Sequence, residues 1–154
     1  MNALYFDDFY LGQEFVTKAR TVTEADVVNF AALSWDTNKL HTDVEYAKTT
    51  AFGERIAHGM LGVVIHSGLS QMLGILEGTI VAFLEMTWKF HLPIRIGDTI
   101  HVVQKVKEKR ETSKSDRGII VFEKELINQN GEKVQSGTTT VLVKRRDQMN
   151  NNME

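Results

Sequence analysis

The segment that most restricts the fold lies near the middle of the chain, where residues 59 to 73 carry no charged side chain. Apolar and small residues recur there at helical spacing, so we predict a helix from Gly59 to about Leu73. Gly62 and Gly68 lower its helical propensity, and it has no charged face to meet water. Because such a helix needs burial to be stable, we expect a sheet to wrap around it.

The second half of the chain supplies that sheet. Segments rich in β-branched and aromatic residues alternate with turn signals such as Pro93 and Gly97-Asp98. Asn130-Gly131 is the strongest short-range hairpin signal in the chain. We predict antiparallel strands at residues 79–91, 99–112, 119–127 and 134–143.

The part of the chain before residue 59 predicts a short strand at residues 14–20 and a second helix. Thr23-Glu24-Ala25-Asp26 has the form of a capping box, and the helix it starts runs to about Leu33. Residues 35–41 are rich in turn formers and predict a structured loop. The whole order predicts an α+β fold in one domain, residues 1–146, with a polar tail at 147–154 that frays.

Composition excludes several classes of function. The chain of 154 residues has a formal net charge of −2, too small to attract nucleic acid, and it has no cysteine for a disulfide, a thiolate nucleophile or a zinc ligand. Its start does not resemble a signal peptide, and the apolar stretch from Met60 to Leu76 is too polar to span a bilayer. We therefore expect a cytoplasmic protein without nucleic-acid or membrane partners.

The densest group of reactive side chains is Asp36-Thr37-Asn38-Lys39-Leu40-His41. A carboxylate and an imidazole five residues apart in one loop can hold a water between them, and an imidazole gives or takes a proton near neutral pH. Asn38 can order the loop through backbone hydrogen bonds. An ordinary turn explains the same residue types, so this spacing alone leaves both interpretations open.

A second candidate is Ala57-His58-Gly59-Met60 at the start of the uncharged helix. Free N–H groups and a partial positive charge at a helix start suit a carbonyl oxygen that gains negative charge. Gly59 would let a substrate approach the backbone closely. Glycine near a helix start is common, so this signal is weak alone.

Together these residues resemble the MaoC-like, (R)-specific enoyl-CoA hydratases. The resemblance rests on residues 30–41, on residues 57–61 and on Ser67-Gly68, and it extends over nearly the whole chain in element order. The family's motif runs from an aromatic and small residues through Gly-Asp-x-Asn-Pro-x-His to a small residue, whose place Ala47 takes here. The resemblance implies a hot-dog fold, which is a curved antiparallel sheet wrapped around a central helix.

The resemblance also implies roles for single residues. Asp36 and His41 would activate the water that adds to an enoyl thioester, and the Gly59 N–H would hold the thioester carbonyl. Asn38 would brace the loop and Ser67 would line the acyl pocket; with Trp35 and Met60, these two are our expected substrate pocket. No cofactor is implied beyond the coenzyme A of the substrate, and acyl carrier protein is an alternative carrier.

Two residues depart from the family's motif. Trp35 stands where the family has glycine, and Lys39 stands where it has proline. Without the proline the loop loses a fixed φ angle. Trp35 would either narrow the acyl pocket or lie in a subunit contact.

The remaining histidines and basic residues have plainer interpretations. We expect His58 to fix the loop and His66, His91 and His101 to be structural, with no metal site. Two basic clusters are expected to be solvated surface, or to grip the phosphates of coenzyme A. They are Lys105, Lys107, Lys109, Arg110 and Lys114, and Lys144-Arg145-Arg146.

Two other functions compete with hydration. A thioesterase of this architecture has a carboxylate on its central helix, and residues 59–74 carry none. A non-catalytic acyl-CoA-binding subunit would keep the shape without the acid–base pair. A hot-dog chain alone exposes a sheet edge and half a substrate tunnel, so we also expect a homodimer or a higher homo-oligomer.

Overall fold

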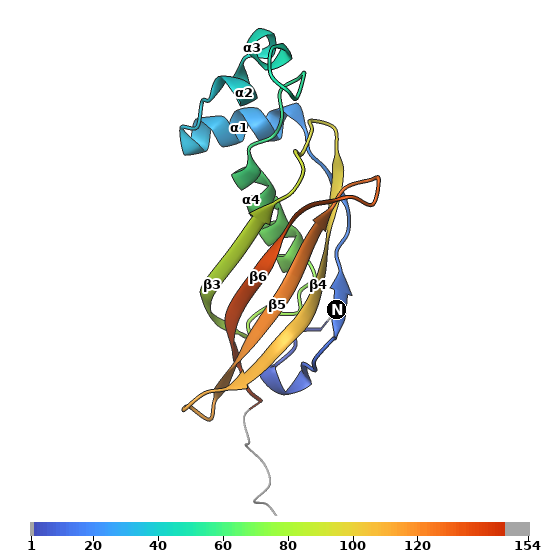
Figure 1. The fold of residues 1–154 in the computed structure, drawn as a ribbon. Helices are drawn as coiled ribbons and strands as arrows, with labels where there is room; N and C mark the ends of the chain where they lie inside the picture. The colour runs from blue at the N-terminus through green and yellow to red at the C-terminus, as the bar shows by residue number, and fades with distance from the viewer. Residues whose placement is uncertain (1, 147–154) are drawn as a thin grey trace, which may run out of the picture.

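The computed structural model describes residues 2–146, and its main feature is a curved antiparallel sheet (Figure 1). The strand order is β1-β4-β5-β6-β3, and β2 pairs with β4 beside this path. The two short strands are β1 (Glu14–Val16) and β2 (Arg20–Thr21). The long strands are β3 (Ile80–Phe90), β4 (Thr99–Glu111), β5 (Arg117–Ile127) and β6 (Lys133–Lys144). The prediction of long antiparallel strands in the second half of the chain is confirmed.

Helix α4 (Gly59–Gln71) packs against one face of this sheet, as the uncharged segment predicted (Figure 1). Its side chains Leu61, Ile65 and Leu69 are buried in one core cluster with residues of β4, β5 and β6. The helix is not buried all round, because Met60 and Val64 are each more than half exposed. The predicted α+β fold with a helix against a curved sheet is confirmed, and the helix still has one open side.

The other helices gather beyond one end of the sheet (Figure 1). They are α1 (Glu24–Ser34), α2 (Lys39–Thr42) and α3 (Val44–Lys48), and a 3-10 turn, η1 (Phe6–Asp8), lies near the N-terminus. The predicted capping box at α1 is present, with the Thr23 hydroxyl accepting from the Asp26 N–H at 3.3 Å. No described helix is long and apolar enough to cross a membrane.

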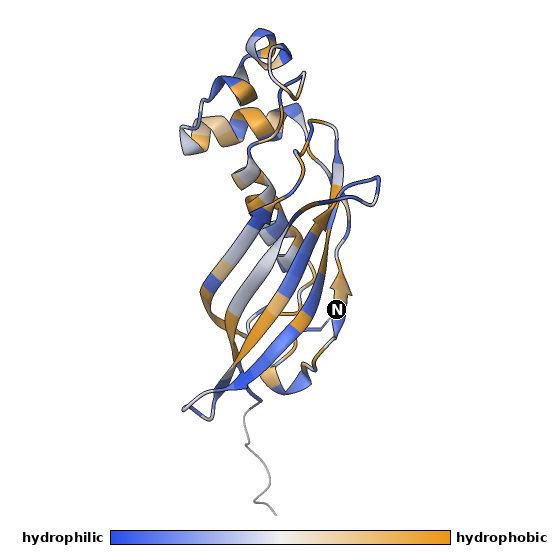
Figure 2. Cartoon of the chain, viewed as in Figure 1, coloured by the Kyte–Doolittle hydropathy of each residue, from blue (hydrophilic) through white to orange (hydrophobic). Residues whose placement is uncertain are grey.

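Burial alternates along much of β4 and β5, whereas β3 is exposed along most of its length, and Figure 2 shows hydrophobic and hydrophilic residues mixed along the long strands. On β4 the buried residues Ile100, Val102 and Val106 alternate with more exposed ones. A second core cluster forms at the far end, where Phe6 and Phe9 pack with residues of β4, β5 and β6. The alternation therefore places one face of the sheet against α4 and η1.

Several boundaries differ from the predictions. The strand expected at residues 14–20 is divided into β1 and β2, and the strand expected at 119–127 begins two residues earlier, at Arg117. The loop expected at 35–41 contains the start of α2, and α3 was not foreseen. Asn38 and Asp43 cap these helices, so the turn-forming residue types were in fact helix starts. The tail expected to fray at 147–154 lies outside the described residues.

Candidate active site

The loop that carries Asp36 begins with an abrupt end to helix α1. The Ser34 hydroxyl donates to the Phe30 carbonyl at 2.7 Å and accepts from the Asp36 N–H at 3.2 Å. Trp35 between them has φ 62° and ψ 13°, and it is the only non-glycine with positive φ among the described residues. This left-handed turn reverses the chain and costs about 1–2 kcal/mol in an L-residue, which explains why glycine suits the position.

Short hydrogen bonds then hold the loop in a fixed shape. The Asp36 carboxylate accepts from the Asn38 N–H at 3.2 Å, and the Asn38 side chain accepts from the Leu40 N–H at 3.0 Å. Asn38 is thereby the N-cap of α2, and Lys39 is its first residue. Proline is favoured at that position because its missing N–H would have no partner in any case. Lys39 therefore keeps the helical start that a proline would supply.

His41 is oriented by a bond from its ring to the segment before α4. Its Nδ1 lies 2.8 Å from the Ile56 carbonyl oxygen. A carbonyl oxygen only accepts, so Nδ1 carries the hydrogen and Nε2 is left with a lone pair. One polar atom from each of Asp36, His41 and His58 lies within 4.8 Å of the others. One water spans up to about 5.6 Å between two partners, so a single water can bridge Asp36 and His41.

His58 supports this arrangement from inside the protein. It is buried, its Nε2 donates to the Asp36 carbonyl at 2.9 Å, and its ring stacks on that of His41 at 3.9 Å between centroids. Burial lowers the pKa of His58, and the neighbouring His41 lowers it further. A neutral His58 donates one hydrogen to the backbone of the loop, which agrees with the expectation that this residue fixes the loop.

Gly59 opens helix α4 immediately beside this group. As the first residue of the helix, it has an N–H that no carbonyl of the same helix can accept. Its own carbonyl accepts from the Gln135 side chain at 2.9 Å, and Gln135 in turn accepts from the Trp88 indole at 2.9 Å. A Cβ at this position would meet the Phe90 ring at 2.9 Å. Any larger residue here would therefore force the half-exposed Phe90 ring to shift.

An open, mostly apolar hollow of about 290 Å³ borders Gly59. Its other walls are formed by the segment before α4 and by the end of β3 with the link that follows, namely Phe52, Ile56, Ala57, Phe90, His91, Leu92, Pro93 and Ile94, together with Gln135. The hollow is large enough to receive part of a thioester beside the helix start. It does not include Trp35, Asn38 or Met60, which were expected to line the substrate pocket. Trp35 is 88% exposed, so its side chain does not narrow this hollow.

Ser67 lies elsewhere along α4, where it borders a second cavity between the helix and the sheet. That cavity contains a lysine that our sequence interpretation missed, Lys124 of β5, which is only 7% exposed. The sequence does contain a signal for the burial of this lysine. Lys124 occurs at period-two spacing with Phe122 and Leu126, so its side chain points to the same face of the sheet as these two buried residues. The structure thus brings Asp36 and His41 together with His58, the residue before Gly59, and places Ser67 at a separate cavity.

The side chains of Asp36, His41 and His58 are also close enough to share a metal ion. One ring nitrogen of His41 and one of His58 is already bonded to a backbone carbonyl, which leaves a single free nitrogen on each. Such a set can hold either a water or a cation, and our expectation that no metal is bound stays a prediction.

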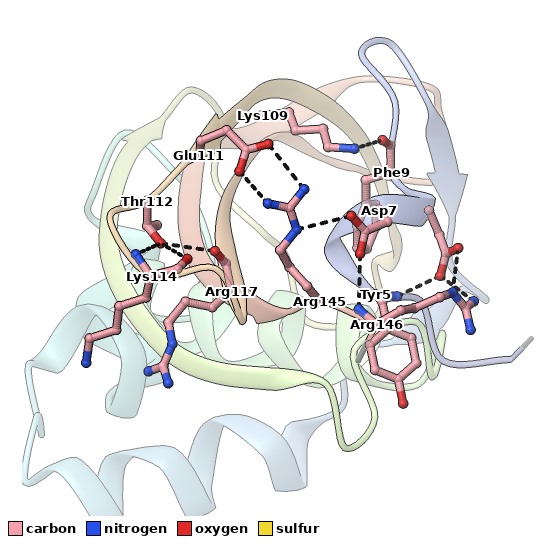
Figure 3. A network of polar contacts seen from close by, with 11 residues as sticks. Tyr5, Asp7, Phe9, Lys109, Glu111, Thr112, Lys114, Arg117, Arg145 and Arg146 are labelled. Carbon is pink, nitrogen blue, oxygen red and sulfur yellow. Dashed lines mark hydrogen bonds and ion pairs between the residues drawn. The ribbon is translucent and has the colours of Figure 1, made fainter. Parts of the chain in front are cut away.

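Three of the basic residues suggested for coenzyme A phosphates have their side chains in a network at the opposite end of the sheet (Figure 3). Arg145 pairs with Glu111 at 2.6 Å and with Asp7 at 3.1 Å, and Arg146 pairs with Asp8 at 2.8 Å. The Lys109 ammonium donates to the Phe9 carbonyl at 2.8 Å. Figure 1 shows this end far from α1, α2 and α3. The ion pairs of Arg145 and Arg146 therefore hold the residues that follow β6 against η1.

Comparisons with known proteins agree with this geometry. The model of the MaoC like domain matches residues 8–143. The chain is 43% identical over 97 residues to an (R)-specific enoyl-CoA hydratase of Rhodospirillum rubrum, a match that covers 62% of this chain and 65% of that protein. It is 37% identical over 119 residues to an (R)-specific enoyl-CoA hydratase of Aeromonas caviae, covering 76% and 83% of the two chains.

Solved structures agree with the fold as well. A protein of Archaeoglobus described as a monoamine oxidase regulatory protein superposes with a TM-score of 0.89 at 35% identity, covering 95% of this chain and 97% of that one. A Mycobacterium tuberculosis protein described as a double hotdog fold superposes with a TM-score of 0.81 at 18% identity, covering 96% of this chain and 46% of that one. The hot-dog fold is therefore shown, and the chain belongs to the MaoC-like domain family.

Proposed function

We propose that this protein catalyses the reversible hydration of a trans-2-enoyl thioester to an (R)-3-hydroxyacyl thioester. The observation that carries the proposal is the group of polar atoms from Asp36, His41 and His58 within 4.8 Å, beside the free N–H of Gly59. Relatives named as (R)-specific enoyl-CoA hydratase and 3-hydroxybutyryl-CoA dehydratase support it. A hydro-lyase needs a positioned water, an acid–base group and a donor to the thioester oxygen, and we assign these tasks to Asp36, His41 and the Gly59 N–H.

The water held between Asp36 and His41 is the nucleophile. Its oxygen forms a bond to the β-carbon while one of its protons passes to the acid–base pair. The π electrons of the double bond move toward the thioester oxygen, and the Gly59 N–H donates to the negative charge that forms there. The same pair then delivers a proton to the α-carbon on the same face, and dehydration follows these steps in reverse.

Each local feature of the site serves this chemistry. The bond from His41 Nδ1 to the Ile56 carbonyl leaves Nε2 free to accept the proton of the water. His58 holds the backbone of Asp36 and, being neutral, adds no second positive charge beside His41. The site needs no cofactor for these steps. The carrier is coenzyme A in our proposal, with acyl carrier protein as the alternative.

We also propose that the protein acts as a homodimer joined through β3. Among the described residues this strand pairs only with β6, so its other edge presents unpaired backbone groups. Apolar side chains on it are partly exposed, with Phe83 at 57% and Leu84 at 50%. A second copy that continues the sheet across this edge would cover both the unpaired backbone and these side chains.

A turnover assay with crotonyl-CoA tests the proposed function. The purified protein should remove the enoyl absorbance, and Asp36→Asn and His41→Ala should each lower kcat by about 10²–10⁴-fold, the usual contribution of a general acid or base. Free thiol should not appear, because its release would indicate a thioesterase.

Two matched variants control for loss of structure. Asp43→Asn keeps a residue that caps a helix well, and His101→Ala removes a histidine on β4. Both should retain wild-type turnover. Full activity in Asp36→Asn and His41→Ala would refute the assigned roles, and the absence of hydration by wild-type protein across enoyl chain lengths would refute the function.

A further inference from the structure

The cavity beside Ser67 has a chemistry that hydration of a plain acyl chain does not require. It has a volume of about 120 Å³, several times the roughly 30 Å³ that one water occupies in the liquid. It lies between α4 and the inner face of the sheet, and the exposed side chains of Ser67 and Phe83 border it. An apolar acyl end would be matched by apolar walls, yet this cavity is lined by both polar and apolar residues.

The single charged group lining the cavity is the ammonium of Lys124. Its only hydrogen-bond partner among the described residues is the Ser70 hydroxyl at 3.2 Å, and no carboxylate lies within the 4 Å of an ion pair. The Phe122 ring centroid is 5.8 Å from Nζ, at the outer limit of a cation–π contact, and the ring carries no negative charge to balance the ammonium. Two of the three N–H groups of this ammonium are therefore left without a partner inside the protein.

Other polar atoms of the cavity are unpaired too. Gln104 faces Lys124 directly across the β4–β5 pairing, and its side-chain oxygen has no partner. The Thr139 hydroxyl and Nε2 of His66 are also buried without partners. His66 Nδ1 bonds to the Val63 carbonyl, so Nε2 is an acceptor. Burial and the Lys124 ammonium lower the pKa of His66 to about 4, so this ring adds no charge near neutral pH.

A buried ammonium without a counter-ion is costly, and burial lowers the pKa of Lys124 to about 8. Buried charges in proteins are normally paired, so the missing partner is a strong indication of what the cavity binds. A carboxylate in this cavity would accept from the two free N–H groups of Lys124, and the unpaired Thr139 hydroxyl lines the same cavity. The neutral acceptors on His66 and Gln104 then bond to water that shares the cavity.

We propose that this cavity binds the far end of the acyl chain and that the substrate is an enoyl thioester with a terminal carboxylate. The inference rests on the proposed hydratase function, and it adds the substrate class. Ser67, which the resemblance implies in the acyl pocket, borders this cavity on α4, the same helix that begins at Gly59. Lys124 is thus a specificity residue that touches the substrate away from the reacting carbons.

The test is a set of trans-2-enoyl-CoAs from six to twelve carbons long that end in a methyl, a hydroxyl or a carboxylate. At one chain length or more, wild-type kcat/KM should favour the carboxylate over the methyl end by about 10- to 100-fold, the usual value of a hydrogen bond to a charged group. Lys124→Met should remove this preference by lowering kcat/KM for the carboxylate series. Lys107→Met, at an exposed lysine on β4, should leave the ratio unchanged.

The possible results separate the two proposals. Hydration of methyl-terminated thioesters with no preference for the carboxylate, or an equal ratio in wild type and Lys124→Met, overturns the inference and keeps the hydratase. A higher kcat/KM for the hydroxyl end than for the carboxylate end also overturns the inference. The neutral acceptors on His66 and Gln104, and not the Lys124 ammonium, would then determine which chain end binds. No hydration of any thioester in the set refutes the proposed function, and the inference falls with it.

Discussion

Replacing Lys124 with methionine should stabilise the protein. The lysine is 7% exposed, and its burial lowers the pKa from 10.5 to about 8. Because one pKa unit equals 1.36 kcal/mol, this lowering corresponds to about 3 kcal/mol of free energy that opposes folding when the lysine is charged. Methionine fills a similar volume and loses one hydrogen bond to Ser70, worth about 1 kcal/mol. We expect Lys124→Met to unfold with about 2 kcal/mol more free energy at pH 7.

The dependence on pH distinguishes this cause from better packing. The folded protein releases the Lys124 proton near pH 8, and the unfolded chain releases it near pH 10.5. Between these values the unfolded state binds more protons, so wild-type stability from this group rises with pH. The penalty is complete below pH 8 and disappears above pH 10.5. The advantage of Lys124→Met should therefore shrink by about 2 kcal/mol between pH 7 and pH 9.5.

Urea unfolding of both proteins at pH 7 and pH 9.5, at one protein concentration, measures these differences. The matched control is Lys107→Met, which removes an exposed lysine of β4 and should change stability by less than about 0.5 kcal/mol at either pH. If Lys124→Met is no more stable than wild type at pH 7, the ammonium is not the unpaired charge that the structure shows. If the extra free energy of unfolding of Lys124→Met is the same at both pH values, better packing is its cause instead.

Three further substitutions test the loop and the helix start. Lys39→Pro should raise the free energy of unfolding by about 0.4–1 kcal/mol in urea titrations, because Asn38 already has an extended backbone and the first N–H of α2 needs no partner. Trp35→Gly should raise it by about 0.5–1 kcal/mol, since relief of the left-handed strain exceeds the added chain entropy, whereas Trp35→Ala should give no gain. Gly59→Ala should lower kcat/KM for crotonyl-CoA at least about tenfold, because the new methyl meets the Phe90 ring and shifts the N–H; unchanged kinetics would contradict a role for that N–H.

Much of the fold could be predicted because its signals are local and repeated. The uncharged segment from Gly59 needed a sheet around it, and the period-two alternation of β4 and β5 supplied the buried face. The short helices α2 and α3 were missed because Asn38 and Asp43 serve equally well in turns and as helix caps. A turn and a helix start differ only in the path of the backbone after the capping residue. Tertiary contacts determine that path.

The candidate site could be predicted in part for a related reason. Asp36 and His41 are close in sequence, so their meeting in space needed only a compact loop. The bonds from His58 to Asp36 and from Gln135 to Gly59 join residues 22 and 76 positions apart, and no spacing rule indicates them. The basic clusters were misleading for the same reason, because the partners of Arg145 and Arg146 are near the other end of the chain.

The burial of the Lys124 ammonium affects both the stability of the protein and its proposed substrate specificity. Its position on β5 faces inward, between the buried Phe122 and Leu126, where an apolar side chain would fill the space without a charge. Gln104 opposite and Thr139 nearby are also polar on this inner face, so the ammonium is part of a polar cluster. A binding partner that carries the opposite charge would return the lost free energy only when it is bound. An enoyl-CoA with a terminal carboxylate should therefore raise the unfolding temperature of wild-type protein more than that of Lys124→Met. The difference between the two shifts would measure the contribution of Lys124 to binding of this substrate class.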